Sequence, residues 1–212
     1  MINLTISEAM TAADGQLVHC EDPAYIGDMF IEGITLDSRK VKPDWLFIAD
    51  KGERADGHDY VESARRSGAA AAVVEHELDI PIPQILVENS LRAMQRIAGY
   101  IREKSGVKVI GVVGSVGKTS TRQMLSCVLE QKFSVLSTEG NFNNEYGLPQ
   151  TFSVSNRITS LRLLKWASAT SAKWTDWAQL HVPITLFSPI SAICTLRTLS
   201  TAAAYFAPKP RL

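Results

Sequence analysis

Short apolar runs alternate with stretches of helical periodicity over most of the chain before residue 137. Apolar runs of strand length predict β-strands at residues 17–20, 30–36, 45–49, 69–74, 84–87, 107–113 and 133–136. Helical spacing predicts helices at residues 5–13, 59–67, 90–106 and 117–131. The last of these is expected to bury Met124, Leu125, Val128 and Leu129. The order strand, helix, strand predicts an α/β fold with a parallel sheet.

Proline and composition divide the predicted elements into three regions. Pro81 and Pro83 mark a linker, so a small α/β domain is expected at residues 1–83. Residues 84–153 form the first part of a second parallel-sheet domain, and residues 154–212 depart from the α/β pattern.

Length and charge exclude several classes of protein. The chain has 212 residues, zero formal net charge and 45% hydrophobic residues, as an ordinary globular protein does, and no nucleic-acid partner is implied. No apolar run approaches the roughly 20 residues of a membrane span, and the first residues lack a charged signal-peptide head, so a cytoplasmic location is expected. Cys20, Cys127 and Cys194 lack metal-ligand spacing and are expected to be buried as small hydrophobic residues.

The predicted strand at 107–113 leads directly into a glycine-rich turn and a helix. The turn and the first helical residues are Gly114, Ser115, Val116, Gly117, Lys118, Thr119 and Ser120. Glycines let backbone amides approach phosphate oxygens, a helix start favours anions, and a Lys-Thr pair supplies a cation and a Mg²⁺ ligand. The pattern therefore indicates a phosphate-binding loop in its short G-x-x-G-K-T form. The alternative is a solvated turn that begins a helix.

Several motifs, in this order, resemble one known family. They are residues 36–39 (Leu-Asp-Ser-Arg), 45–49 (Trp-Leu-Phe-Ile-Ala), 56–60 (Asp-Gly-His-Asp-Tyr), 68–70 (Gly-Ala-Ala), the loop at 114–120, and 138–149 (Thr-Glu-Gly-Asn-Phe-Asn-Asn-Glu-Tyr-Gly-Leu-Pro). This set is similar to the ATP-dependent Mur ligases of peptidoglycan synthesis. The segment at 138–149 resembles the branch that adds D-alanyl-D-alanine.

The resemblance implies a fold, a reaction and a set of site residues. The fold is a small N-terminal α/β domain for the UDP-substrate, followed by the first part of a P-loop ATPase domain. The cofactors are ATP and Mg²⁺. The substrates are UDP-N-acetylmuramoyl tripeptide and D-alanyl-D-alanine, which the enzyme joins through an acyl phosphate. The enzyme is expected to be a monomer. The implied roles are phosphate neutralisation by Lys118, Mg²⁺ ligation by Thr119, binding of the uridine nucleotide by Ser38 and Arg39, and contact with the muramoyl substrate near the metal by Asn143 and Asn144. Without this context, the Asp-Ser-Arg segment indicates only a turn that ends a strand, and the two asparagines indicate loop residues.

The composition changes after residue 153. All 13 glycines lie at or before Gly147, and Asp176 is the one acidic residue between Asn156 and Leu212. A cationic tail or a basic interaction segment is one interpretation. The other interpretation is translation in a shifted frame. Tryptophan has a single codon, so the shifted codons that begin with its last base are fixed: they encode Gly, Asp and Gly after Trp166, Trp174 and Trp177. With the free bases chosen, residues 165–198 then read as a continuation of the same ligase.

An off-frame tail has a functional consequence. It would replace the family's remaining metal ligands and its C-terminal domain, so the chain is expected to be inactive. The alternative function is a non-catalytic remnant that binds a UDP-sugar or a nucleotide.

Overall fold

The computed structural model describes residues 4–20, 22–52, 55–112 and 117–137, together with three later strands. The chain forms two compact units, Met1–Ser105 with Pro149–Arg157 and Gly106–Leu148 with Ile158–Leu212. The first unit contains β1 (Leu4–Thr5), α1 (Ile6–Ala13), β2 (Gln16–Val18), α2 (Pro23–Gly27), β3 (Phe30–Ile31), β4 (Gly33–Thr35), η1 (Ser38–Lys40), β5 (Trp45–Ile48), η2 (Gly57–Tyr60), α3 (Val61–Arg66), β6 (Ala71–Val74), β7 (Gln84–Leu86) and α4 (Ser90–Ser105). The second contains β8 (Lys108–Val112), α5 (Lys118–Leu129), β9 (Val135–Ser137), β10 (Leu161–Lys165), β11 (Ile184–Phe187) and β12 (Arg197–Thr198).

A five-stranded sheet with the order β2-β7-β6-β5-β4 organises the first unit. Strands β4 to β7 are parallel, whereas β2 joins the edge at β7 in the antiparallel sense. The short strands β1 and β3 form a separate antiparallel pair. The predicted α/β fold with a mostly parallel sheet is therefore confirmed.

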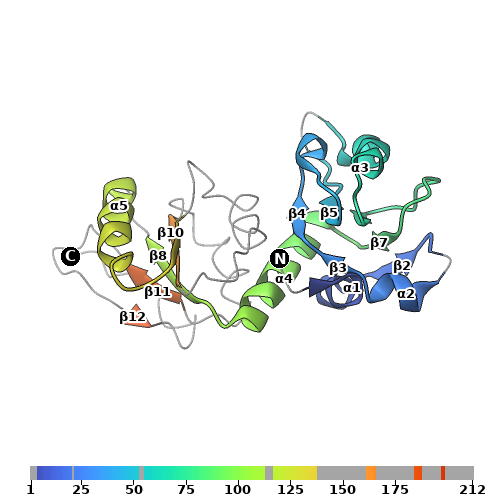
Figure 1. The fold of residues 1–212 in the computed structure, drawn as a ribbon. Helices are drawn as coiled ribbons and strands as arrows, with labels where there is room; N and C mark the ends of the chain where they lie inside the picture. Colours follow the sequence, from blue (N-terminus) through green and yellow to red (C-terminus); the bar gives the residue numbers. More distant parts are fainter. Residues whose placement is uncertain are drawn as a thin grey trace, which may run out of the picture. The chain divides into compact units, whose positions relative to one another are not determined.

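Helices cover both faces of this sheet. Phe47 on β5 packs in one cluster with Val61 and Ala64 of α3, so α3 covers that face. Side chains alternate along a strand, which places Leu46 and Ile48 on the opposite face, against which α4 packs. Helices α1 and α4 lie side by side, on the other side of the strands from α3 (Figure 1). Leu46, Phe47 and Ile48 are all at most 1% exposed.

A polar contact fixes α1 against α4. Thr5 and Glu8 form a capping box at the start of α1, in which each side chain accepts from the other residue's backbone amide. The Glu8 carboxylate also accepts hydrogen bonds from Tyr100 and Lys104 of α4. Glu8 thus caps the start of α1 and also binds α1 to α4.

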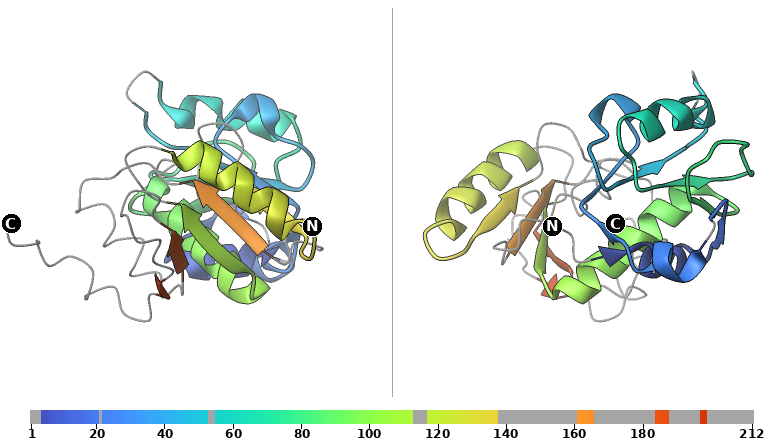
Figure 2. Two further views of the ribbon diagram at one scale, coloured as in Figure 1. Left: turned by 90° about the vertical axis from the view of Figure 1, so that its left-hand side faces the viewer. Right: turned by 45° about the vertical axis from the view of Figure 1, so that its right-hand side comes forward.

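The second unit contains another five-stranded sheet, with the order β12-β11-β8-β10-β9. Strand β8 is parallel to β10 on one side and to β11 on the other, and only β12 is antiparallel. Helix α5 lies against β8, β9 and β10 (Figure 2). The strand predicted to enter the phosphate loop is therefore an interior strand of a parallel sheet.

Two details of the first unit differ from the sequence prediction. The strand expected at 30–36 is divided at Glu32, whose amide donates to the carbonyl of Asp44 at 2.8 Å, so β3 pairs with β1 while β4 pairs with β5. Gly33 is the first residue of β4, and a side chain there would clash with the Trp45 ring, which lies 2.5 Å from the position of a Cβ. The first unit also extends past the boundary expected at residue 83, since β7 pairs with β2 and β6, and α4 covers the sheet.

The prediction of a buried apolar face on α5 was wrong for two residues. Met124 and Val128 are 71% and 70% exposed, whereas Leu125 and Leu129 are half-buried. The less exposed side of the helix is formed by residues 121, 122, 125, 126 and 129, whereas Met124 and Val128 lie on the exposed side. Cys127, on the same helix, is exposed rather than buried, and Cys20 is half-buried. Cys194 lies outside the described residues.

Three strands fall within residues 154–212. Strands β10, β11 and β12 each join the sheet of β8. A strand requires only suitable apolar positions, so this pairing does not decide the reading frame of its codons. The off-frame origin of the segment stays a prediction.

Candidate functional site

The carboxyl end of β8 leads into α5 through the expected phosphate loop. Gly117 stands immediately before α5 with φ of 75°, a left-handed conformation that an L side chain rarely adopts. Its carbonyl accepts from the amide of Thr121 at 2.9 Å and so begins the hydrogen bonds of the helix. The structure therefore explains the second glycine of the motif by its backbone conformation.

The first helical residues of α5 present polar groups at this end of the sheet. Thr119 and Ser120 are exposed, and Lys118 is half-buried. Crevices at the carboxyl ends of parallel strands bind ligands in open α/β sheets, and a helix start favours an anion. Gly114, Ser115 and Val116 lie outside the described residues, as do Asn143 and Asn144, so their predicted roles stay predictions.

Within the described part of the chain, no group of three or more His, Cys, Asp or Glu side chains is placed to hold a metal ion. Among the described residues of the loop, Thr119 and Ser120 have exposed hydroxyls, and Thr119 is the one predicted to bind the metal. Mg²⁺ commonly takes few protein ligands and completes its octahedron with water and substrate phosphates. A hydroxyl at the start of this helix therefore fits Mg²⁺ brought with a nucleotide.

A second polar site follows the end of β4 in the first unit. The amide of Asp37 donates to the hydroxyl of Thr35, the last residue of the strand, at 3.0 Å. The Asp37 carboxylate then accepts from the Arg39 backbone amide at 3.1 Å, from Arg39 Nε at 2.8 Å and from Nη2 at 3.0 Å. Asp37 thus connects the buried residue Thr35, at the end of β4, to the exposed guanidinium of Arg39.

The two residues expected to bind the uridine nucleotide differ in exposure. Ser38 is 9% exposed, whereas the side chain of Arg39 is 87% exposed. Hydrogen bonds from Arg39 lower the pKa of Asp37, although burial raises it, and the same pair raises the pKa of Arg39. At this site the charged side chain of Arg39 is exposed to solvent, whereas Ser38 is almost completely covered by neighbouring residues.

The importance of Asp37 was not foreseen from the sequence, although it stands in the resembling motif. Its signal was an aspartate two residues before an arginine at a strand end, a spacing at which an Asp side chain can accept from the backbone two residues on. The structure brings Lys118 and Thr119 together in one unit, and Ser38 and Arg39 together in the other.

Comparison with known proteins places the segments that contain both sites in one family. The model of the Mur ligase family catalytic domain matches residues 30–113, and the model of the Mur ligase middle domain matches residues 112–162. The chain belongs to the Mur ligase family. The two matches meet at the end of β8, so the Mur ligase chain contains the N-terminal domain and the start of the middle domain. Both belong to a family of peptidoglycan-synthesis ligases.

Relatives of this Mur ligase chain are similar over most of it. It is 36% identical over 151 residues to UDP-N-acetylmuramoyl-tripeptide--D-alanyl-D-alanine ligase of Escherichia coli (strain K12), covering 71% of this chain and 32% of the relative. It is 38% identical over 168 residues to the ligase of the same name from Bacillus subtilis (strain 168), covering 78% and 36%. The chain thus spans about a third of the length of these curated relatives.

Solved structures of Mur ligases share the fold. A MurF crystal structure from Acinetobacter baumannii matches 86% of this chain and 40% of its own, with a TM-score of 0.76 and 27% identity. The MurF ligase of Thermotoga maritima in complex with ADP matches 76% of this chain and 38% of its own, with a TM-score of 0.66 and 30% identity. Among the described residues, no helix is long and apolar enough to cross a membrane.

Proposed function

We propose that this chain carries the UDP-substrate domain and the phosphate loop of an ATP-dependent ligase that joins D-alanyl-D-alanine to UDP-N-acetylmuramoyl tripeptide. One observation carries the proposal: β8 is an interior parallel strand, and the chain that follows it reaches a left-handed glycine, Gly117, and a helix that starts with Lys-Thr. The names of its relatives supply the substrates. The proposed enzyme works in the cytoplasm as a monomer.

The residues of the loop have distinct proposed roles toward ATP. The ammonium of Lys118 neutralises charge on the terminal phosphates, and the amides of residues 115–117 cradle phosphate oxygens. The hydroxyl of Thr119 ligates Mg²⁺, which when bound offsets negative charge on the transferred phosphate. A similar protein, the MurF ligase of Thermotoga maritima, has been solved in complex with ADP, which supports nucleotide binding.

The proposed reaction begins at the terminal carboxylate of the tripeptide. A carboxylate is a poor acyl donor, and its phosphorylation by ATP gives an acyl phosphate that the amine of D-alanyl-D-alanine attacks, with release of phosphate. Phosphoryl transfer depends mostly on positioning and charge neutralisation, which a loop of this kind provides. Arg39 and Ser38 are proposed to hold the uridine nucleotide, and Asn143 and Asn144 to lie beside the muramoyl substrate.

We also propose that residues 154–212 are translated off frame and that this polypeptide does not complete the reaction. The proposal rests on the absence of glycine after Gly147 and on the single acid, Asp176, after Asn156. Carboxylates are the usual protein ligands of Mg²⁺, so a segment with one acid has little with which to complete a metal site. The nucleotide sequence across codons 150–170 tests the reading frame directly.

Separate binding and turnover measurements test the function. The full chain is titrated by calorimetry with Mg·ATP and with the UDP-muramoyl tripeptide, and phosphate release is then measured with all three substrates. Binding of both ligands without turnover above background is the expected result. Turnover would refute the proposed inactivity, binding of the UDP-ligand alone would favour a non-catalytic remnant, and binding of neither would refute the function.

A further inference from the structure

The hydrogen bonds of Asp37 leave one edge of the Arg39 guanidinium open. A guanidinium has five N–H donors and can form two parallel hydrogen bonds along either of two edges. Asp37 occupies the edge made by Nε and Nη2, at 2.8 Å and 3.0 Å. The edge made by Nη1 and Nη2 takes no part in this contact. It has the donor spacing that suits two oxygens of a phosphate.

The same contact fixes the orientation of a side chain that is 87% exposed. An exposed arginine otherwise samples many rotamers, and binding a ligand must then select one of them at an entropic cost. Asp37 is itself fixed, since its amide donates to Thr35 Oγ1 and its carbonyl accepts from the Lys40 amide at 2.9 Å. Thr35 is 5% exposed, at the end of a strand inside the unit. The guanidinium is therefore held by a chain of bonds that starts in the core.

Charge alone does not account for this arrangement. The Asp37 carboxylate offsets the charge of Arg39, so the pair attracts a distant anion less than an unpaired arginine would. An aspartate at this position helps an anionic ligand only by aiming the open edge at it. Asp37 therefore has two opposing effects on affinity for an anion: it orients Arg39, which favours binding, and its negative charge repels the ligand. Measuring affinity without the Asp37 charge shows which effect is larger.

We propose that Asp37 is a positioning residue, which holds Arg39 with its Nη1–Nη2 edge open to the phosphate oxygens of a uridine diphosphate group. This inference rests on the proposed function, because it takes the ligand of the first unit to be a UDP-linked substrate. Asp37 itself does not contact the ligand. Its effect on binding passes entirely through Arg39.

Binding of UDP and of uridine to the full chain tests the inference. The variants are Asp37→Asn, Arg39→Ala and the double variant, each titrated by calorimetry with both probes. Asparagine keeps the acceptor for the Arg39 amide and Nε but turns a donor toward Nη2, so it breaks the two-bond contact that orients the guanidinium and keeps the turn. Asp22→Asn is the matched control, because Asp22 accepts from the amides of Ala24 and Tyr25 in the same way but has no arginine partner among the residues that the structure describes.

The expected result is that Asp37→Asn weakens UDP binding about tenfold, as when a free Arg39 adopts the competent orientation about a tenth of the time. In the Arg39→Ala background the same change has no effect, and uridine binding is unchanged throughout. Equal losses in both backgrounds, a loss of uridine binding, or unchanged or tighter UDP binding by Asp37→Asn would each overturn the inference.

If the wild-type chain binds UDP but Arg39→Ala binds it equally well, the inference fails and the proposed function stands. If the wild-type chain binds no UDP, the inference fails, and the proposed function fails with it if the UDP-muramoyl tripeptide and Mg·ATP do not bind either.

Discussion

The Nε2 atom of His58 accepts a hydrogen bond from the backbone amide of Glu75 at 2.9 Å, across 17 residues of sequence. The other ring nitrogen, Nδ1, pairs with the Asp56 carboxylate, which also accepts from the His58 amide. This assigns the proton of a neutral ring to Nδ1 and the acceptor lone pair to Nε2. The imidazole, 5% exposed, thus ties the turn before α3 to the end of β6.

Replacing His58 by phenylalanine is expected to destabilise the protein by about 2 kcal/mol, because the ring shape remains while the Glu75 amide loses its acceptor. Urea denaturation followed by circular dichroism measures the change. His76→Ala is the control, since His76 is exposed and only stacks on His58 at 4.4 Å. A His58→Phe variant as stable as the control would contradict this assignment.

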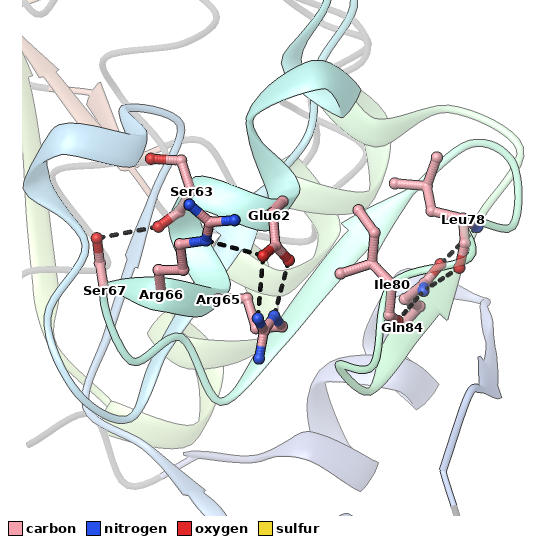
Figure 3. Close-up of polar contacts among 8 residues, drawn as sticks. All are labelled: Glu62, Ser63, Arg65, Arg66, Ser67, Leu78, Ile80 and Gln84. Carbon is pink, nitrogen blue, oxygen red and sulfur yellow. Dashed lines mark hydrogen bonds and ion pairs between the residues drawn. The ribbon is translucent and has the colours of Figure 1, made fainter.

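The side chain of Gln84 holds the segment that precedes β7. It is 0% exposed, accepts from the Leu78 amide at 2.9 Å, and donates to the carbonyls of Leu78 at 2.8 Å and Ile80 at 3.2 Å (Figure 3). Gln84→Leu is expected to cost about 2–3 kcal/mol, because it leaves these backbone groups without their partner. Hydrogen exchange of the Leu78 amide should accelerate more than exchange at Val73 on β6. Equal protection in variant and wild type would show that the side chain is not needed.

Glu62 makes paired contacts with two arginines on α3, Arg65 at 2.7 Å and Arg66 at 2.9 Å (Figure 3). Hydrogen bonds from Arg65 and then Arg66 lower the pKa of Glu62 from 4.5 to about 2. A carboxyl whose pKa falls on folding stabilises the native state above its unfolded value, and this stabilisation is lost as the pH falls through its folded value. The contribution of Glu62 should therefore be complete above pH 4.5 and disappear toward pH 2.

Melting temperatures of wild type and Glu62→Gln, compared at several pH values, measure that contribution. The difference should be small at pH 7, persist to about pH 4 and shrink below it, and it should also fall in 1 M salt because the groups are exposed. A difference that is already lost at pH 5 would contradict the lowered pKa.

Lys118→Met is expected to weaken ATP binding by about tenfold or more, because a charge-assisted contact with phosphate is removed. Lys108→Met is the matched control, since Lys108 is exposed at the start of β8, at the end of the strand away from the phosphate loop. Fluorescence titration with a labelled nucleotide measures both. Equal affinity of the two variants would exclude the proposed role of Lys118.

Thr119→Val is expected to reduce the effect of Mg²⁺ on ATP affinity while leaving metal-free binding unchanged, because valine keeps the shape and removes the hydroxyl. Titration with and without Mg²⁺, in wild type and variant, measures the difference. Loss of binding in both conditions would indicate a structural role for Thr119 instead.

Much of the fold could be predicted from the sequence because its signals are local. The helical spacing at residues 5–13, the helix that stops before Gly68 and the strand-glycine-lysine order at the phosphate loop each depend on residues close in sequence. Helix α2 was missed although Asp22 and Pro23 mark its start, because one turn of helix carries too little periodicity to be recognised. The divided strand at 30–36 was missed because its break at Glu32 involves a hydrogen bond to the carbonyl of Asp44, a residue outside the strand.

The sequence by itself determined the α/β order, the phosphate loop and the resemblance to Mur ligases, since motif spacing and periodicity are properties of neighbouring residues. The tertiary structure alone decided that β8 lies between β10 and β11, that Glu8 meets Lys104, and that His58 meets the Glu75 amide. It also decided which edge of Arg39 is left open, because Asp37 takes the other. Such contacts join groups whose distance is set by packing and hydrogen-bond geometry, which residue order does not specify.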